Sequence, residues 1–249
     1  MTGTNMAIFL TGDMHGENGV RKFGARWFDA KKPVPLTRSD YMIILGDFGL
    51  VWRAPPSDSE TYWLDWLERK PWTTLVVLGN HENHRLIREL PPEPWQGGLV
   101  RRFREHVLQL VDNEVFEIDG KTFFVRGGAH SLDRDLREEG KDWWPEETPD
   151  AAERQEAIDK LNALNWRVDY VLTHEAPFGQ YEHVFPELDK RFLAQDEYAV
   201  WLQTIADRLD FERWFFGHLH EDRFDLGRYT ALYGNVATLD GRPCERVRG

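Results

Sequence analysis

Near its N-terminus the sequence reads MAIFLTGDMHG over residues 6–16. The apolar run 6–10 predicts a buried strand, and Gly12 marks the point where that strand gives way to a loop. Asp13 and His15 follow at once. In an open α/β sheet, ligands bind at the carboxyl ends of the strands. A carboxylate and an imidazole at such a place are a hard and a borderline ligand, which together suit a divalent cation.

The same succession of strand, loop and helix recurs in the first ninety residues. Apolar runs at 41–45 and 74–78 predict two more buried strands, each followed by a glycine and a polar residue. Apolar side chains at helical spacing predict helices over 20–30 and 59–69, the second with Ser59 as its N-cap. Strands that alternate with helices in this way are typical of a parallel sheet covered by helices.

The middle of the chain has a different pattern. The stretch 91–98 is predicted to be a proline-rich connection, and strand-like runs follow at 107–111, 114–118 and 122–125. Asp119-Gly120 predicts a hairpin turn between the last two of these runs. We therefore expect an antiparallel section here, on a second sheet.

The segment 131–150 is highly charged and contains Trp143-Trp144, and we expect it to form a long loop that acts as a lid. The two tryptophans either stack on a nucleobase or anchor the loop to the core, and anchoring is favoured because tryptophan is commonly buried. The rest of the chain repeats the alternation, with a helix at 151–164, a strand at 170–174, a helix at 195–209, a strand at 213–216, and short strands near 224, 229–233 and 236–239. Because no internal repeat or clear linker is present, residues 1–249 are expected to form a single domain.

Composition narrows the class of partner. The formal net charge is −12, so the chain offers no broad basic face to a long nucleic acid. Cys244 is the only cysteine, which excludes an internal disulfide and a thiolate zinc site. Residues 1–5 lack the basic region of a signal peptide, and no apolar run reaches the length of a membrane span. We therefore expect a cytoplasmic protein that does not bind membranes.

Five of the predicted strands end in residues that can bind a metal ion. These residues are Asp13 and His15, then Asp47, then Asn80 with His81 beside it, then His174, and finally His218 and His220. Each of them alone has a structural explanation, but the same strand context repeats every time. The set combines carboxylate, amide and imidazole ligands, which favour Mn²⁺, Fe or Zn²⁺ over Ca²⁺.

In this order the residues resemble a known family, the calcineurin-like metallophosphoesterases. The family pattern of Asp-x-His, Gly-Asp, Gly-Asn-His, a lone His and Gly-His-x-His matches the residues just named, over residues 8–220. The resemblance implies an α/β (α+β) fold in which two mixed β-sheets pack face to face between helices, in four layers α-β-β-α. It also implies two divalent metal ions as cofactors, Mn above all, with Fe, Zn or Ni as alternatives.

The resemblance also implies a role for each residue. It divides the metal ligands into three groups, namely Asp13, His15 and His220 for one ion, Asn80, His174 and His218 for the other, and Asp47 as the bridge. Asp47 and His81 are the implied catalytic residues, and His81 protonates or stabilises the leaving oxygen. Glu82 or a nearby Asp is the expected carboxylate partner that restores the pKa of His81. Two ions that share a bridging hydroxide can hydrolyse a phosphomonoester or phosphodiester by in-line attack.

Part of the match favours the serine/threonine phosphoprotein phosphatase branch of the family, and part departs from it. That branch carries Asp-Arg-Gly shortly after its bridging Asp, whereas Asp47 is followed here by Phe48. Its second arginine precedes the Gly-Asn-His-Glu block, where this chain has Leu78. The two arginines that grip phosphate are therefore missing from their places in the sequence. Arg53 is the candidate for substrate binding in the loop after Asp47, with a surface position as the alternative.

These observations predict a metal-dependent phosphoesterase whose substrate is a phosphorylated small molecule or a short nucleotide. A protein phosphatase is the first alternative, and the missing arginines count against it. A non-catalytic metal-binding scaffold is the second, and the intact ligand set counts against it. The sequence indicates no particular oligomeric state.

Overall fold

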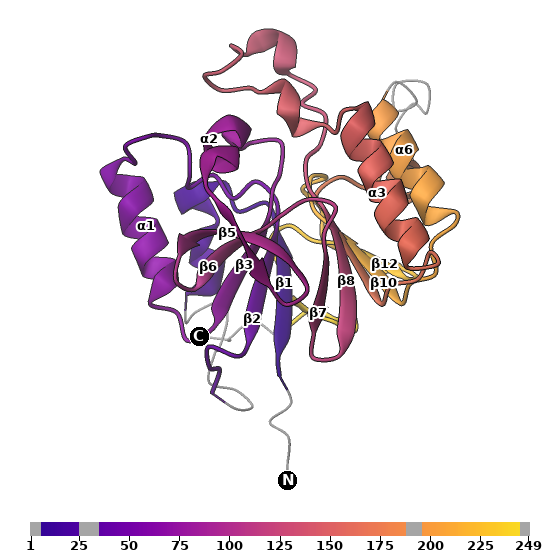
Figure 1. Cartoon of the computed structure of the whole chain (residues 1–249), viewed down its shortest axis with the longest axis horizontal. Helices are drawn as coiled ribbons and strands as arrows, with labels where there is room; N and C mark the ends of the chain where they lie inside the picture. Colours follow the sequence, from indigo (N-terminus) through magenta and orange to yellow (C-terminus); the bar gives the residue numbers. More distant parts are fainter. Residues whose placement is uncertain (1–5, 25–34, 188–195, 245–249) are drawn as a thin grey trace.

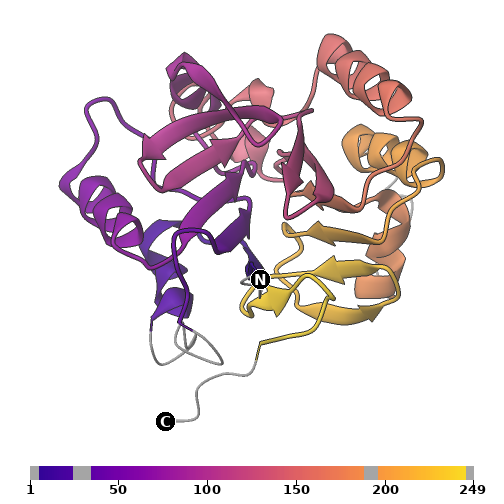
Figure 2. The ribbon, with the colours of Figure 1, turned by 60° about the horizontal axis from the view of Figure 1, so that its bottom comes forward.

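The computed structural model of the chain describes residues 6–24, 35–187 and 196–244. Two β-sheets pack face to face, and helices lie outside them (Figure 1). Figure 2 shows the early strands, in indigo to magenta, on one side and the late strands, in orange to yellow, on the other. This arrangement confirms the predicted fold class of two mixed sheets flanked by helices.

The first sheet has seven strands in the order β13-β1-β2-β3-β6-β5-β4. Four parallel strands form its centre, namely β1 (Ile8–Gly12), β2 (Tyr41–Leu45), β3 (Thr73–Val77) and β6 (Val107–Leu110). Antiparallel strands form its two edges. At one edge β5 (Gly98–Arg104) pairs with β6, and β4 (Pro92–Trp95) pairs with β5. At the other edge β13 (Ala237–Thr238) pairs with β1. Every residue of β2 and β3 is buried, which explains their continuous apolar runs.

The prediction for residues 91–111 is wrong in two respects. Strand β6 lies parallel to β3 in the first sheet instead of in an antiparallel second sheet, and residues 92–95 form an edge strand instead of a connection. Proline is compatible with an edge strand because the missing N–H is not needed on the open side. Strand β5 is hidden in the sequence because its arginines interrupt the apolar alternation, although Val100 and Phe103 are buried.

The second sheet has six strands in the order β11-β12-β10-β9-β8-β7. These strands are β7 (Val115–Ile118), β8 (Lys121–Arg126), β9 (Tyr170–Thr173), β10 (Arg213–Phe216), β11 (Arg223–Leu226) and β12 (Tyr229–Ala231). Asp119 and Gly120 adopt φ values of 52° and 69° and form the predicted hairpin turn between β7 and β8. Strands β8, β9, β10 and β12 run parallel, so their carboxyl ends share one edge of the sheet.

The helices follow the expected alternation with small shifts. They are α1 (Asp58–Glu68), α2 (His84–Glu89), α3 (Ala151–Ala163), α4 (Phe178–Val184) and α6 (Glu197–Ala206), with short 3-10 turns η1 (Gly16–Asn18), η2 (Val20–Phe23), η3 (Arg134–Leu136) and η4 (Pro145–Glu147). Helix α1 begins after Ser57 instead of Ser59, because Ser57 and Glu60 form a reciprocal capping box. Of the helix predicted over 20–30, residues 20–23 form only the turn η2, and residues 25–30 lie outside the described ranges.

Three buried apolar clusters join the layers. One lies between the sheets and includes Leu10 and Leu75 from the first sheet and Leu172 and Phe215 from the second. The other two lie between each sheet and its outer helices. Within the described ranges, no helix is both long and apolar enough to span a bilayer.

The cluster between the sheets is expected to carry much of the stability. Leu172 is fully buried there, whereas Leu136 in the 131–150 segment is 90% exposed. Leu172→Ala should lower the free energy of unfolding by about 2–5 kcal/mol, because it leaves a cavity in a close-packed core. Leu136→Ala should change it by less than about 0.5 kcal/mol. Urea unfolding followed by tryptophan fluorescence measures both values, and equal effects would contradict the assigned core.

Candidate metal centre

The seven predicted metal ligands come together where the carboxyl ends of the strands of both sheets meet. Each ligand follows a strand, with Asp13 and His15 after β1, Asp47 after β2, Asn80 after β3, His174 after β9, and His218 and His220 after β10. The first sheet therefore supplies four of these residues and the second sheet three. Packing of the two sheets is what brings them to one place.

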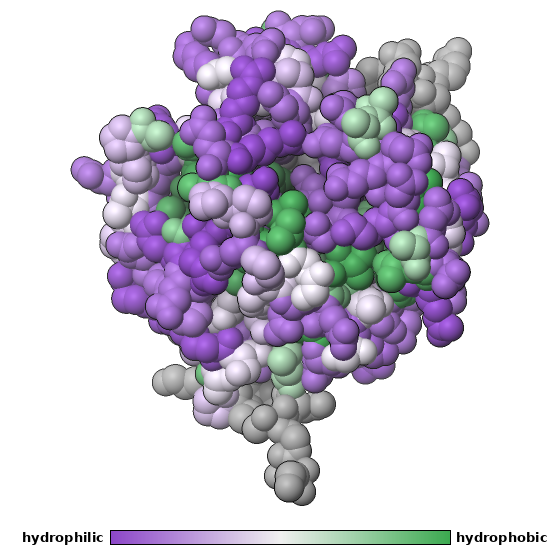
Figure 3. Space-filling view, viewed as in Figure 1, coloured by the Kyte–Doolittle hydropathy of each residue, from purple (hydrophilic) through white to green (hydrophobic). Residues whose placement is uncertain are grey.

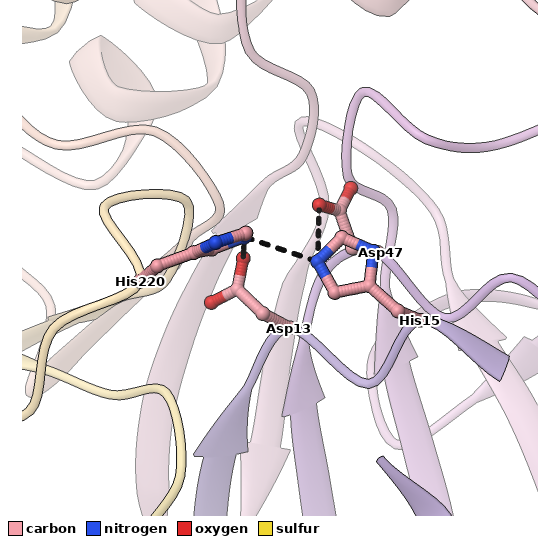
Figure 4. Close-up of side chains that lie close together, drawn as sticks. All are labelled: Asp13, His15, Asp47 and His220. Atoms are coloured by element: carbon pink, nitrogen blue, oxygen red, sulfur yellow. Dashed lines mark hydrogen bonds and ion pairs between the residues drawn. The ribbon is translucent and has the colours of Figure 1, made fainter. Parts of the chain in front are cut away.

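The first group of ligands consists of Asp13, His15, Asp47 and His220, whose ligand atoms all lie within 4.8 Å of one another (Figure 4). His15 Nε2 is 3.0 Å from His220 Nε2 and 3.5 Å from Asp47 Oδ2. His220 Nε2 is 3.5 Å from Asp13 Oδ1. Two imidazole nitrogens and two carboxylate oxygens thus converge on one point, a donor set that fits a divalent transition-metal cation.

The second group lies on the other side of Asp47. His174 Nε2 is 3.3 Å from Asp47 Oδ1 and 3.1 Å from Asn80 Oδ1. The His218 ring lies 5.1 Å from the His174 ring, measured between centroids. Asp47 therefore presents Oδ2 to the first group and Oδ1 to the second. This is the arrangement that a carboxylate shared between two neighbouring cations requires.

The backbone that carries the ligands is strained. Five of the predicted ligands adopt positive φ, namely Asp13 (42°), His15 (47°), Asp47 (49°), His218 (62°) and His220 (53°). Non-glycine residues rarely take this conformation, and clusters of them mark functional sites. Backbone amides hold the two carboxylates in place, because the His218 N–H donates to Asp13 Oδ1 at 3.0 Å and the His81 N–H to Asp47 Oδ1 at 2.9 Å.

Two glycines let the strand ends approach this closely. Gly46 has a φ of +92°, and a Cβ at this position would overlap the His174 imidazole. A Cβ at Gly79 would overlap the Asp47 carboxylate. The Gly-Asp and Gly-Asn-His patterns in the sequence thus reflect the space that the ligands occupy.

Burial governs the protonation of the ligands. Burial raises the pKa of Asp13 to about 7. The nearby His174 lowers this pKa, and the negative charge of Asp47 raises it further. Burial lowers the pKa of His15 to about 4 and that of His218 to about 3, which favours the neutral imidazole that binds metal ions. For His174 burial is outweighed by contact with Asp47, which raises the pKa of His174 to about 10. The same contact, also against burial, lowers the pKa of Asp47. A bound cation would take the place of that proton.

His81 lies beside the first group, with its ring centroid 5.4 Å from that of His15. Its Nδ1 is 3.2 Å from Arg137 Nη1, and its Nε2 is 3.3 Å from Arg137 Nη2. Burial lowers the pKa of His81, Asp47 opposes this shift, and Arg137 adds to it. The surroundings of His81 therefore favour its neutral form.

Glu82 supports the ligand loop instead of His81, so its predicted pairing with that histidine is wrong. Its carboxylate accepts the backbone N–H of Phe48 at 2.5 Å and that of Gly49 at 3.2 Å. Burial and the nearby Asp47 raise the pKa of Glu82 to about 8. Its role is to hold the chain that follows Asp47.

Two further predictions concern residues at the edge of the centre. The Arg53 side chain is exposed, and among the described residues it makes no hydrogen bond or ion pair with the ligand set. This position matches the surface alternative. Trp144 is only 2% exposed and packs on Trp52 with the ring centroids 5.2 Å apart, which confirms that Trp144 anchors the 131–150 segment.

Three residues at the centre were not predicted. The Ser131 hydroxyl accepts a hydrogen bond from Asn80 Nδ2 at 2.9 Å and so orients that amide. Glu175 Oε2 lies 3.5 Å from His218 Nε2 and has no hydrogen-bond partner among the described residues. Arg137 contacts His81. Only Glu175 has a signal in the sequence, because it directly follows a predicted ligand, whereas the other two come from the 131–150 region.

Comparison with known proteins identifies the family of this chain. The family model described as Calcineurin-like phosphoesterase matches residues 6–222. The chain therefore belongs to the calcineurin-like phosphoesterase family. It is accordingly a phosphoric-ester hydrolase, and the family implies divalent metal ions as cofactors.

Among the solved structures similar to this chain is the crystal structure of phosphopantetheinyl hydrolase from Mycobacterium tuberculosis. The two chains are 17% identical, and the match covers 93% of this chain and 91% of the other, with a TM-score of 0.45. No curated protein sequence matches the chain.

The loop that carries Asn80 also contains a group whose titration can be measured. His84 is buried at the start of α2, with Nε2 3.0 Å from the carbonyl oxygen of Gly79. Burial lowers the pKa of His84 from 6.5 to about 4, so the folded state favours the neutral ring. Its contribution to stability is complete above the unfolded pKa and is lost as the pH falls from about 6.5 to about 4.

His84→Gln removes this titration and keeps a neutral hydrogen-bond donor. The experiment compares the unfolding free energies of metal-free wild type and variant. Between pH 4 and pH 7 the value for the wild type should rise by about 3 kcal/mol more than the value for the variant. Urea unfolding at a series of pH values measures the difference. The wild-type protein, measured at the same pH values, gives the reference pH dependence. A His84 variant that also kept it would contradict the assignment.

Proposed function

We propose that this protein hydrolyses a phosphomonoester or a phosphodiester at a pair of cations, with the seven residues named above as their ligands and Asp47 shared between them. One observation carries the proposal. The two oxygens of the Asp47 carboxylate face different histidines, Oδ2 at 3.5 Å from His15 Nε2 and Oδ1 at 3.3 Å from His174 Nε2. The mixed oxygen and nitrogen donors fit Mn²⁺, our first choice, with Fe, Zn²⁺ or Ni²⁺ as alternatives.

The residues of the centre suit an anionic substrate. Two divalent cations, when bound, would supply Lewis acidity and lower the pKa of water. Asp13 and Asp47 contribute only about two negative charges, so the loaded centre keeps a net positive charge for the phosphoryl group. His81 faces the first group from the side, and in its neutral form it donates one N–H. We assign this hydrogen bond to the leaving oxygen.

A cavity beside the first group supports a small substrate. It has a volume of about 360 Å³, and its lining includes Asp13, His15, Arg21 and Tyr233. This volume lies in the range of small-molecule sites. The net charge of −12 does not favour a long nucleic acid, so the proposed substrate is a phosphorylated small molecule or a short nucleotide. We also propose a reducing, cytoplasmic setting, which agrees with the single free Cys244.

Hydrolysis of model esters tests the proposal. Protein loaded with Mn²⁺ is expected to hydrolyse p-nitrophenyl phosphate or its bis-ester, and EDTA should abolish the activity. Asp47→Asn removes the shared charge and should reduce turnover roughly 100-fold or more. Asp210→Asn is the matched control, because the Asp210 side chain is 72% exposed and lies outside the ligand set.

Three outcomes separate the hypotheses. Turnover of either ester that depends on the cation and on Asp47 supports the proposal. Turnover of a phosphopeptide but of neither ester would favour the protein phosphatase. No turnover by protein shown to bind two cations would overturn the proposal in favour of the scaffold.

Glu175 is proposed to orient a ligand of the second cation. Its Oε2 is fully buried, lies 3.5 Å from His218 Nε2, and has no hydrogen-bond partner among the described residues. An imidazole that donates its Nε2–H to this oxygen leaves Nδ1 for a cation. Carboxylates behind metal-binding histidines typically contribute 10- to 100-fold in metal affinity.

Glu175→Gln should therefore weaken binding of one of the two Mn²⁺ ions by about 10- to 100-fold, because the amide is a poorer acceptor for the imidazole N–H. Calorimetric titration of metal-free protein measures this affinity. Glu212→Gln is the control, since the Glu212 side chain is 54% exposed and pairs with Lys121, outside the ligand set. Two unchanged Mn²⁺ affinities in Glu175→Gln would refute the role.

A further inference from the structure

The 131–150 segment brings the side chain of Arg137 to the edge of the metal centre. It lies at the top of Figure 1 and carries mainly hydrophilic side chains in the space-filling view (Figure 3). From this segment Arg137 reaches the His81 ring, with its two terminal nitrogens 3.2 and 3.3 Å from the two ring nitrogens. The His81 ring in turn lies 5.4 Å from the His15 ring of the first ligand group. The His81 ring therefore lies next to both the Arg137 guanidinium and His15 of the first ligand group.

The guanidinium is held in a fixed orientation. Asp133 binds it through two parallel hydrogen bonds, from Nε to Oδ1 at 2.8 Å and from Nη2 to Oδ2 at 2.7 Å. Nη1 donates to the carbonyl oxygen of Asp142 at 3.1 Å. The Arg137 side chain is only 15% exposed, although Asp133 is 51% exposed. Such an arrangement reduces the entropy that a ligand contact would cost.

Counting donors shows that Arg137 has binding capacity left over. A guanidinium has five N–H groups, and three of them are used by Asp133 and Asp142. The remaining two point to the two ring nitrogens of His81. A neutral imidazole offers only one acceptor nitrogen, so at least one of these N–H groups has no acceptor there. At least one Arg137 N–H next to His81 is therefore available to another acceptor.

We propose that Arg137 binds the phosphoryl group of the substrate, with Asp133 as the residue that positions it. This inference rests on the proposed function of the centre. A guanidinium donates two N–H groups to phosphate oxygens in a geometry that matches them. Arg137 follows His81 by 56 residues in the sequence and contacts it through the fold.

The competing explanation is that Arg137 only ties the 131–150 segment to His81. The segment has other attachments, however. Trp144 packs on Trp52, and Arg85 forms ion pairs with Glu139 at 2.7 Å and Glu146 at 2.8 Å. A purely structural Arg137 would affect folding or metal content. A phosphate-binding Arg137 affects phosphate affinity and KM instead.

Phosphate binding distinguishes the two roles. Inorganic phosphate is titrated into Mn²⁺-loaded protein by calorimetry, and KM is measured with p-nitrophenyl phosphate. Arg137→Gln should weaken phosphate binding and raise KM by about 10- to 100-fold, with two Mn²⁺ ions still bound. Arg137→Lys keeps the positive charge but loses the planar pair of N–H donors. Its phosphate affinity and KM should therefore lie between those of the wild type and Arg137→Gln. Asp133→Asn should shift both values in the same direction by a smaller factor.

Arg134→Gln is the matched control, because the Arg134 side chain is 52% exposed and its ion pair is with Asp135 in the same turn. It should leave phosphate affinity and KM unchanged. Wild-type phosphate affinity in Arg137→Gln, or a loss that accompanies loss of Mn²⁺, would overturn the inference. If the wild type hydrolyses no ester, the proposed function fails, but the comparison of phosphate binding between wild type and Arg137→Gln still decides the role of Arg137.

Discussion

The Asp47 carboxylate joins the two sheets of this protein. It follows β2 of the first sheet, and its Oδ1 lies 3.3 Å from Nε2 of His174, which follows β9 of the second. The relative position of the sheets is set by the apolar cluster between them, in which Leu10 and Leu172 are fully buried. Because packing at this density tolerates little displacement, the core fixes the distance between the strand ends. The geometry of the centre is therefore a consequence of how the sheets pack.

That geometry opposes stability in the absence of cations. Five of the predicted ligands have left-handed backbone conformations, each of which costs of order 1–3 kcal/mol. Burial also raises the pKa of Asp13 to about 7 and those of Glu82 and Glu175 to about 8, so the fold disfavours their charged forms. A cation would reverse this preference for the acids that face it. Since ligands that bind only the folded state stabilise it, metal binding and folding are expected to be linked here.

The parts of the structure that were predictable from the sequence are those in which neighbours in the chain are also neighbours in space. Strand β2 has the predicted bounds because both of its faces are buried, and the side chains predicted as ligands meet because they follow such strands. Strand β5 was missed because its arginines hide the apolar alternation. Ser131 and Arg137 were missed because they meet residues 51 and 56 positions away. Arg53 shows the converse, since it is close to Asp47 in the chain but exposed in the structure.

The metal centre and the segments beside it are built from different parts of the chain. The predicted ligands follow short strands next to glycines that leave no room for a Cβ, so this part of the structure can change little without losing its geometry. The parts that surround it are under no such constraint. On the side of His15, the cavity with Arg21 and Tyr233 is formed by the turn η2 and the chain after β12. On the side of His81, the 131–150 segment is attached through the buried Trp144 and through the ion pairs of Arg85 with Glu139 and Glu146. Substrate selectivity can therefore vary through these segments while the strand ends keep the same ligands.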